Sequence, residues 1–302
     1  MFIASQRKTK TRVLLAKAAV KQYPLWFIVP GAIIYIVLFA YPTFSSFYYS
    51  LTRWTLFDVE FIGMDNYIRF FSEPSLSLSL TNTFIFAFVT SASKVIIGMA
   101  LAIWLSGAIF AKSYLRAVIF FPALVSTIGV GITFKALMAP EKGLLNVTLS
   151  IFGVEGPYWL TEPSYALFSL AGIEIWKGVG IATVIYIAGI AAIPNEFREA
   201  ALVDGASAWQ VFRRITLPLL TPATSTVIIL SLIGGLRTFD LIWATTGGGP
   251  GFATDVLASV IYKNYQAGFY GLSTAGNVVL FVMVAIIIYP LSAWLNRRIV
   301  EV

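Results

Sequence analysis

Long apolar stretches separated by short polar segments dominate the chain. Six of these stretches are long enough to cross the roughly 30 Å hydrocarbon core of a bilayer, which takes about 20 helical residues. They cover residues 25–49, 80–105, 117–138, 166–192, 223–244 and 272–295. The pattern therefore predicts an all-α integral membrane protein with six transmembrane helices and a polar helical insertion between the fourth and the fifth.

The composition agrees with a location in a bilayer. Of the 302 residues, 58% are hydrophobic and 12% are charged, whereas soluble domains carry about 25% charged residues. The first apolar run is about twice as long as that of a signal peptide and lacks an A-x-A cleavage site, so we interpret it as a retained span. The expected organisation is a basic tail over 1–23, a membrane domain over 24–298 and a short end over 299–302.

Basic residues in the polar segments predict the orientation, because cytoplasmic loops carry an excess of Lys and Arg. The opposite side has Arg53, Arg69, Lys142 and Lys263 and a larger number of acidic residues. Both termini and the polar insertion are therefore expected in the cytoplasm. The basic residues assigned to that side are Arg7, Lys8, Lys10, Arg12, Lys17, Lys21, Lys112, Arg116, Arg198, Arg213, Arg214, Arg297 and Arg298.

The residue types exclude several kinds of chemistry. The chain has no cysteine and no histidine, which removes disulfides, thiol nucleophiles, zinc–histidine sites and Ser-His-Asp catalysis. It also lacks a GxxxxGK[ST] phosphate loop. We expect no catalytic residue, no metal site and no cofactor in this chain. The net charge of +7 lies mostly in the tail and indicates attraction to anionic membrane lipid rather than to a nucleic acid.

The polar insertion over 193–222 has the pattern of a helix–turn–helix. Pro194 suits a first helical position and Glu196 a first turn, which favours negative charge. Gly205 follows where a left-handed residue commonly closes a helix. Ser207 and Gln210 have the spacing of a capping box that opens a second helix. Ala208, Phe212, Ile215 and Leu219 share one face of that second helix.

The same insertion resembles, residue for residue, the EAA loop of ABC-importer permeases. The matching pattern is Glu-Ala-Ala-x₃-Gly-x₉-Ile-x-Leu-Pro from Glu199 to Pro218. In that family the loop is a cytoplasmic coupling helix that docks in a cleft of the ATPase subunit. The resemblance therefore implies an ATPase-coupling role for Glu199, Ala200, Ala201, Asp204, Gly205, Ile215, Leu217 and Pro218.

Within that resemblance, Glu199 would make an ionic contact, Ala200 and Ala201 a close-packing contact, and Gly205 a hinge-like turn. The partners implied are two copies of an ABC ATPase that bind ATP and magnesium, an extracytoplasmic solute-binding protein, and a second permease subunit. The family usually pairs two different permease chains, so a heterodimer is expected.

Three further segments are similar to the sugar-importing branch of these permeases, of the maltose type. They are Phe61-Ile62-Gly63-Met64-Asp65-Asn66-Tyr67, Gly143-Leu144-Leu145-Asn146 and Thr246-Gly247-Gly248-Gly249-Pro250. Together with the EAA loop they extend the resemblance from about residue 25 to residue 298. It implies that the chain forms the translocation pathway of a binding-protein-dependent importer of a sugar or oligosaccharide.

Four charges lie at membrane depth, where each costs about 2.5–3.5 kcal/mol unless it faces a cavity or a partner. Glu174 and Lys177 are three residues apart on one predicted helix and can pair with each other. Lys94 and Arg237 can pair across helices or reach toward the interface. These placements leave internal ion pairs and a solute pathway as alternatives.

The fourth span carries the expected solute site. Its segment Glu174-Ile175-Trp176-Lys177-Gly178 aligns with an Asn-x-Trp-x-Gly pattern that lines the sugar site in maltose-type permeases, with Glu174 in place of the amide. An indole can stack on a sugar ring while charged groups bind its hydroxyls. By the same resemblance Thr127, Ser231 and Gly235 fall on pocket positions, although small residues also mediate helix packing.

Two other function classes remain as alternatives. A secondary carrier or channel would work without an ATPase and needs a mid-membrane ion site or proton relay, for which Glu174 is the one candidate carboxylate. A membrane-embedded enzyme needs clustered acids or histidines, and the outer acidic residues are scattered. The exact solute and its charge are not determined by these residues.

Overall fold

The computed structural model describes residues 25–107 and 109–297. The basic tail over 1–23 and the short end over 299–302 therefore lie outside the described residues, together with Arg298. The chain divides into two compact units, Met1–Tyr49 and Ser50–Val302, which are considered separately below.

The described part of the first unit is one helical run that contains the predicted span over 25–49. It has a π-helical turn, η2, where the Tyr41 N–H donates to the carbonyl of Ile36. Pro42 follows this turn and has no N–H to donate to the carbonyl four residues earlier, so an interruption of the regular ladder is expected there. The elements are η1 (Leu25–Ile28), α2 (Val29–Tyr35), η2 (Ile36–Ala40) and α3 (Tyr41–Tyr49).

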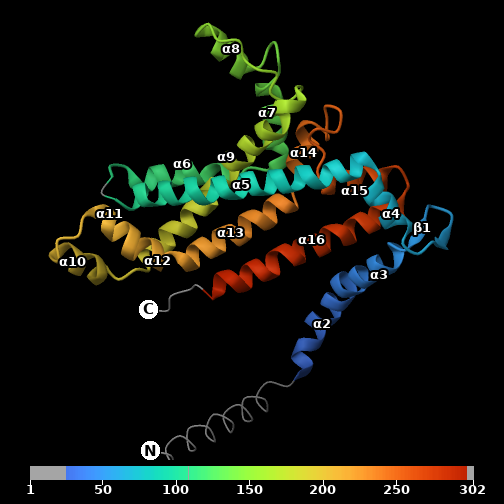
Figure 1. Cartoon of the computed structure of the whole chain (residues 1–302), viewed down its shortest axis with the longest axis horizontal. Helices are drawn as coiled ribbons and strands as arrows, with labels where there is room; N and C mark the ends of the chain where they lie inside the picture. Colours follow the sequence, from blue (N-terminus) through green and yellow to red (C-terminus); the bar gives the residue numbers. More distant parts are fainter. Residues whose placement is uncertain (1–24, 108, 298–302) are drawn as a thin grey trace, which may run out of the picture. The chain divides into compact units, whose positions relative to one another are not determined.

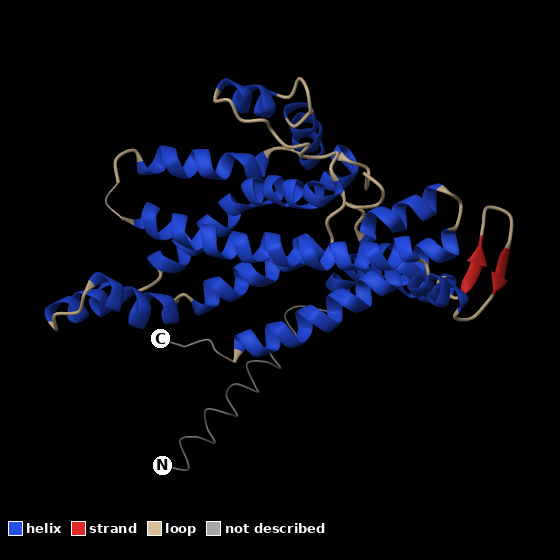
Figure 2. Cartoon of the chain, turned by 45° about the horizontal axis from the view of Figure 1, so that its top comes forward, coloured by secondary structure: helices blue, strands red, loops and turns tan. Residues whose placement is uncertain are grey.

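The second unit is almost entirely helical (Figures 1 and 2). Its longest helices are α5, α9 and α16, and shorter helices connect them. In chain order the elements are β1 (Thr52–Trp54), β2 (Val59–Phe61), α4 (Asp65–Ser72), α5 (Pro74–Ser106), α6 (Lys112–Leu124), α7 (Thr127–Leu137), α8 (Leu144–Ile151), α9 (Pro163–Ala191), α10 (Asn195–Val203), α11 (Ala208–Val211), η3 (Phe212–Thr216), α12 (Leu217–Leu219), α13 (Thr221–Leu236), α14 (Asp240–Thr245), α15 (Leu257–Gln266) and α16 (Tyr270–Asn296).

Helix α5 is the central element of this unit, because it contributes to three separate hydrophobic clusters. Leu76 packs with α4, α15 and α16. Phe86 packs with α7, α9 and α14, and Ala102 packs with α9 and α13. The side chains of Phe86 and Ala102 have no exposed surface. A single long helix thus connects the packing of the whole unit from one end to the other.

Four of the predicted spans are continuous helices, and two are broken. The continuous ones are Trp26–Tyr49, Pro74–Ser106, Pro163–Ala191 and Tyr270–Asn296. Helices α6 and α7, which share the span predicted over 117–138, meet at an angle of 95°. The segment Ala208–Leu219, which precedes the span predicted over 223–244, meets α13 at 63°. Residues 25–107 and 109–297 therefore contain four helices long and apolar enough to cross a membrane, or up to six if each bent pair is one span.

The boundaries of two predicted spans were wrong. The helix predicted over 117–138 is interrupted at Val125 and Ser126, where the backbone is extended. Pro122, inside the last turn of α6, cannot donate a backbone hydrogen bond and weakens the helix there. The helix predicted over 223–244 ends at Leu236 and resumes as α14 at Asp240.

Two smaller corrections concern strands and charge. The expectation of an all-α chain missed the antiparallel pair β1–β2, in which Arg53 faces Glu60. The assignment of charged residues omitted Lys135, which lies inside the span predicted over 117–138 and in the last turn of α7. Neither changes the helical architecture.

Candidate functional site

Helix α10 ends in the closing turn that its sequence predicts. The Ala206 N–H donates to the carbonyl of Ala201 at 2.9 Å, and the Gly205 N–H donates to the carbonyl of Leu202 at 3.1 Å. This pair of bonds is the Schellman motif, which needs a left-handed residue at Gly205. Gly205 has a φ of +79°, which confirms the prediction for this position.

The second helix of the loop begins with the predicted capping box. The Ser207 N–H donates to Gln210 Oε1 at 2.7 Å, and the Gln210 N–H donates to Ser207 Oγ at 3.3 Å. The helix then widens into the π turn η3, in which the Leu217 N–H donates to the carbonyl of Phe212. Pro218 follows and cannot supply the next backbone donor. The helix–turn–helix prediction is therefore confirmed in its turns.

One detail of the prediction was wrong. Pro194 is the residue before the first helical position, since α10 begins at Asn195 and Pro194 has extended backbone angles. Glu196 does lie in the first turn of α10, where a negative charge is favourable.

The residues that match the coupling pattern are presented to solvent. Glu199, Ala200, Asp204 and Gly205 are exposed, and no residue of α10 is buried. Leu217 and Pro218 are exposed, whereas Ala201 and Ile215 are half-buried. Large apolar side chains share this exposure, with Val203 87% and Trp209 64% exposed. The loop is well formed by its own hydrogen bonds but leaves a mixed apolar and charged surface uncovered within this chain.

The charges at membrane depth pair differently from the prediction. Lys94 Nζ on α5 lies 2.7 Å from Glu174 Oε1 on α9, and their side chains are 6% and 20% exposed. Glu174 therefore pairs with Lys94 and not with Lys177. Of the two alternatives given for Lys94, the structure shows pairing across helices. Arg237 lies exposed at the end of α13.

Gly178 provides the space for this ion pair. A Cβ atom at that position would lie 2.5 Å from Lys94 Cε and 2.7 Å from Lys94 Nζ. The space left by this glycine of the Asn-x-Trp-x-Gly pattern is thus occupied here by the Lys94 side chain. A larger residue at Gly178 would displace the ammonium group from Glu174.

The other residues expected along the solute pathway are spread over three helices. Trp176 on α9 is 45% exposed, and its ring lies 5.3 Å from that of Phe134 on α7. Thr127 begins α7, Ser231 lies on α13, and both are half-buried. Gly235 is buried, and a Cβ atom there would lie 2.6 Å from Ala87 Cα on α5. Its small size is explained by helix packing.

Asparagine side chains anchor two of the three segments that are similar to sugar-importing permeases. In the first, Asn66 Nδ2 donates to the carbonyls of Ser50 and Thr52 at 2.9 and 2.8 Å. In the second, Asn146 Nδ2 donates to the carbonyl of Pro140 at 2.9 Å and its Oδ1 accepts from Trp159 Nε1 at 2.6 Å. These signatures fix loop conformation through buried hydrogen bonds.

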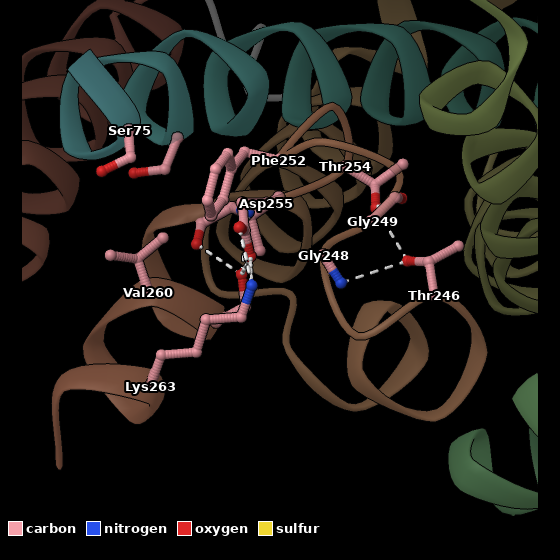
Figure 3. A network of polar contacts seen from close by, with 12 residues as sticks. Ser75, Thr246, Gly248, Gly249, Phe252, Thr254, Asp255, Val260 and Lys263 are labelled. Carbon is pink, nitrogen blue, oxygen red and sulfur yellow. Dashed lines mark hydrogen bonds and ion pairs between the residues drawn. The ribbon is translucent and has the colours of Figure 1, made fainter. Parts of the chain in front are cut away.

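The third signature belongs to a polar network that the sequence analysis missed (Figure 3). Asp255 has no exposed surface, and its two carboxylate oxygens lie 2.8 and 2.7 Å from Lys263 Nζ on α15. The backbone of Gly248 lies against this pair, and a Cβ atom there would overlap Asp255 Oδ1. Asn82 on α5 donates to the carbonyls of Ala253 and Asp255 at 3.1 and 2.9 Å.

A signal for this network exists in the sequence. Asp255 precedes a helix and Lys263 lies eight residues later, so the pair spans the first two turns of α15. Among the residues that the structure describes, no group of three or more acidic, His or Cys side chains could hold a metal ion.

Comparison with known proteins places this architecture in one family. The sequence pattern described as "Binding-protein-dependent transport system inner membrane component" matches residues 25–301. The chain is similar to the trehalose/maltose transport system permease protein MalF of Thermococcus litoralis, with 36% identity over 85% of this chain and 88% of that protein. It is also similar to the arabinooligosaccharides transport system permease protein AraP of Bacillus subtilis, with 30% identity over 88% of this chain and 86% of that one.

A solved structure shares the fold. A chain of a bacterial ABC transporter involved in the import of the acidic polysaccharide alginate has a TM-score of 0.78 and 21% identity, and the similarity covers 97% of this chain and 99% of that one. The family pattern covers all of the described helices, including the loop from α10 to α12. The chain belongs to the inner membrane components of binding-protein-dependent transport systems and is a multi-pass membrane protein.

Proposed function

We propose that this chain forms half of the membrane pathway of an ATP-driven sugar importer, with six spans and both termini in the cytoplasm. The six-span arrangement treats α6 and α7 as one bent span and takes α13 as the fifth span, which leaves Ala208–Leu219 in the coupling loop. If the chain were instead a secondary carrier or channel that works without an ATPase, the polar insertion between α9 and α13 would have no evident role. Two ATPase subunits and an extracytoplasmic solute-binding protein complete the proposed assembly.

The observation that carries the proposal is the exposed, well-formed loop from α10 to α12. Its turns are fixed by the Schellman motif at Gly205 and the capping box at Ser207. A loop with exposed Leu202 and Trp209, 50% and 64% exposed, gains free energy when another protein covers those side chains. We propose that an ATPase subunit does so and that Glu199 makes a charged contact at its edge.

A sugar or oligosaccharide is the proposed solute. The relatives named above transport trehalose or maltose and arabinooligosaccharides according to their names. A second solved structure of the alginate transporter is in complex with a periplasmic protein that holds an alginate pentasaccharide. These comparisons support a carbohydrate and a separate binding protein.

Within this chain we propose that the solute passes Trp176, with Thr127 and Ser231 as hydroxyl partners. The indole of Trp176 is half exposed and packs beside the ring of Phe134. One face of this rigid aromatic side chain can therefore contact a solute. The 2.7 Å contact with Lys94 is made by Oε1 of Glu174, and the second carboxylate oxygen takes no part in it. The ion pair therefore offers a hydrogen-bond acceptor without a net charge, which suits a neutral sugar.

Six spans enclose too narrow a pathway for an oligosaccharide, so we propose that a second permease chain of different sequence lies beside this one. The proposal of a different chain follows the resemblance to permeases that usually pair two different subunits.

Reconstituted transport tests the coupling. The chain and its co-purifying subunits are placed in liposomes, and uptake of labelled maltose and trehalose is measured with ATP and the binding protein. Glu199→Lys and Gly205→Trp should abolish stimulated uptake while leaving the protein in the membrane. Glu196→Lys is the matched control, since Glu196 lies on the same exposed helix outside the coupling pattern.

Full stimulated transport by both coupling variants would refute the proposal, as would uptake that proceeds without ATP. In the same assay Trp176→Ala should raise the KM for solute and Trp176→Phe should restore it, because the aromatic face remains. An unchanged KM in Trp176→Ala would remove the indole from the pathway.

A further inference from the structure

A cavity of about 590 Å³ lies behind the coupling loop. Its wall is formed by the end of α5, the start of α6, the end of α9 and the inner side of the loop from α10 to η3. Cavities of 300–1,000 Å³ commonly hold small-molecule ligands. Two residues of the coupling loop, Leu202 and Ile215, border the cavity, but the proposed coupling to an ATPase assigns no function to the cavity itself.

The charged side chains that line the cavity are all cationic. They are Lys112 and Arg116 on α6 and Arg198 on α10, and no acidic side chain is among the lining residues. Lys112 and Arg116 are half-buried. Three cations around one cavity repel one another unless an anion lies between them.

The end of α5 accounts for only part of this charge. Lys112 Nζ donates to the carbonyl of Ser106 at 3.3 Å, and Arg116 Nη2 donates to the carbonyl of Leu105 at 3.3 Å. A helix C-terminus is equivalent to about half of one negative charge, so two cations there leave a positive excess. Arg116 Nε is buried without a hydrogen-bond partner among the described residues, so one N–H donor of the guanidinium lacks an acceptor there.

The rest of the wall is apolar. Ile103 of α5, Ile187 and Ile190 of α9 and Phe212 of the loop are among its lining residues. Ile103 lies on the apolar span α5 and is 38% exposed. An apolar wall beside a cluster of cations fits a molecule that has an anionic phosphate and a hydrocarbon chain, and it fits a free sugar poorly.

We propose that this cavity binds the headgroup and upper chain of one anionic phospholipid, with its phosphate between Lys112, Arg116 and Arg198. The choice of a lipid rests on the cytoplasmic orientation proposed above, which places the cavity beside the inner membrane surface. Since α5, α6 and the coupling loop all contribute to the wall, the bound lipid holds the loop against the membrane helices.

Native mass spectrometry of the assembled transporter tests the site. The complex in mild detergent is titrated with phosphatidylglycerol or with phosphatidylcholine of the same chains, and the lipids retained per complex are counted. Wild type should retain one phosphatidylglycerol that phosphatidylcholine does not replace. Lys112→Gln with Arg116→Gln should bind it about thirtyfold more weakly, the factor that corresponds to about 1 kcal/mol for each basic residue.

A matched control is Arg213→Gln with Arg214→Gln, which removes the same charge from exposed positions of η3 outside the cavity lining. This variant should retain the lipid, since only general attraction to the membrane is weakened. Equal loss in both double variants, or equal retention of the two lipids by wild type, would overturn the proposal.

Two further comparisons distinguish a failure of assembly from a loss of lipid binding, and a lipid from a soluble anion. If the double variant does not assemble, Lys112→Arg with Arg116→Lys keeps the charges and should retain the lipid, and each single Gln variant should lose part of it. Glycerol phosphate added at millimolar concentration should not displace the retained lipid, because it has no chain to contact the apolar wall. Displacement by glycerol phosphate would identify a soluble anion as the ligand and overturn the lipid assignment.

Discussion

The polar loops at the two ends of the helical unit differ in how hydrogen bonds hold them in place. The loop between α14 and α15 is tied to the rest of the unit by buried bonds, with Asp255 fully buried and Asn82 of α5 donating to two of the loop carbonyls. The loop from α10 to α12, at the other end in Figure 1, is held mainly by bonds within itself. One end is anchored, and the other is formed but uncovered.

This difference separates two uses of polar residues in a membrane protein. Buried polar groups that are fully satisfied rigidify a structure, and they are costly when a partner is removed. Local caps fix the shape of a segment without attaching it to the core. We therefore expect the anchored end to respond to mutation through global stability, and the coupling loop to respond through local order and transport.

The largest effect is expected for Asp255→Asn. Removing one partner of a buried ion pair lowers the free energy of unfolding by about 3–5 kcal/mol. Because the Lys263 side chain is 34% exposed, we expect a loss of about 3 kcal/mol here. The variant should lower the thermal midpoint of the detergent-solubilised protein. Glu60→Gln is the control, since the Arg53–Glu60 pair is 66% exposed on both sides and is worth less than about 1 kcal/mol. Equal effects from the two variants would contradict the distinction.

A smaller loss is expected for Asn82→Ala. The change leaves the carbonyls of Ala253 and Asp255 without their side-chain donor, which costs about 2 kcal/mol for buried groups. Asn264→Ala serves as the comparison, because the Asn264 side chain donates to the carbonyl of Val260 on its own helix. The thermal midpoint should fall for the first and hardly move for the second. A reversed order would show that the loop is not anchored through α5.

The smallest effect on stability is expected for Ser207→Ala. It removes the acceptor for the Gln210 N–H, and loss of such a cap costs about 1 kcal/mol of local helix stability. Trypsin cleavage at Arg213 and Arg214 should become about fivefold faster, while the thermal midpoint stays unchanged. Ser207→Asp keeps a capping oxygen and should restore slow cleavage. A drop in the midpoint as large as that of Asn82→Ala would mean that the loop belongs to the core.

The features that were predicted from the sequence are local ones. The capping box joins residues three apart and the turn at Gly205 closes one helix, so a short stretch of sequence carries the whole signal. Helices over the continuous apolar stretches were likewise predicted, because the length and composition of a stretch are enough to indicate a membrane span.

The features that were missed depend on contacts between distant residues. Lys94 and Glu174 are 80 positions apart, and the sequence offered Lys177 as a nearer partner for Glu174. Gly235 matched a pocket position, yet its packing against Ala87 depends on how α13 crosses α5. The break between α6 and α7 was missed because Pro122 alone does not decide between a kink and a full change of direction.

That break has a consequence for hydration. At 1.5 Å per residue the 13 residues of α6 span about 20 Å, and α7 turns away at 95°, so it adds little depth. The last carbonyls of α6 and the first N–H groups of α7 lack helical partners. Backbone of this kind is tolerated at membrane depth only against protein or water. Val125 packs against the hydrophobic cluster that contains Phe86, whereas Ser126 is exposed, so we expect water to reach the break on the side of Ser126.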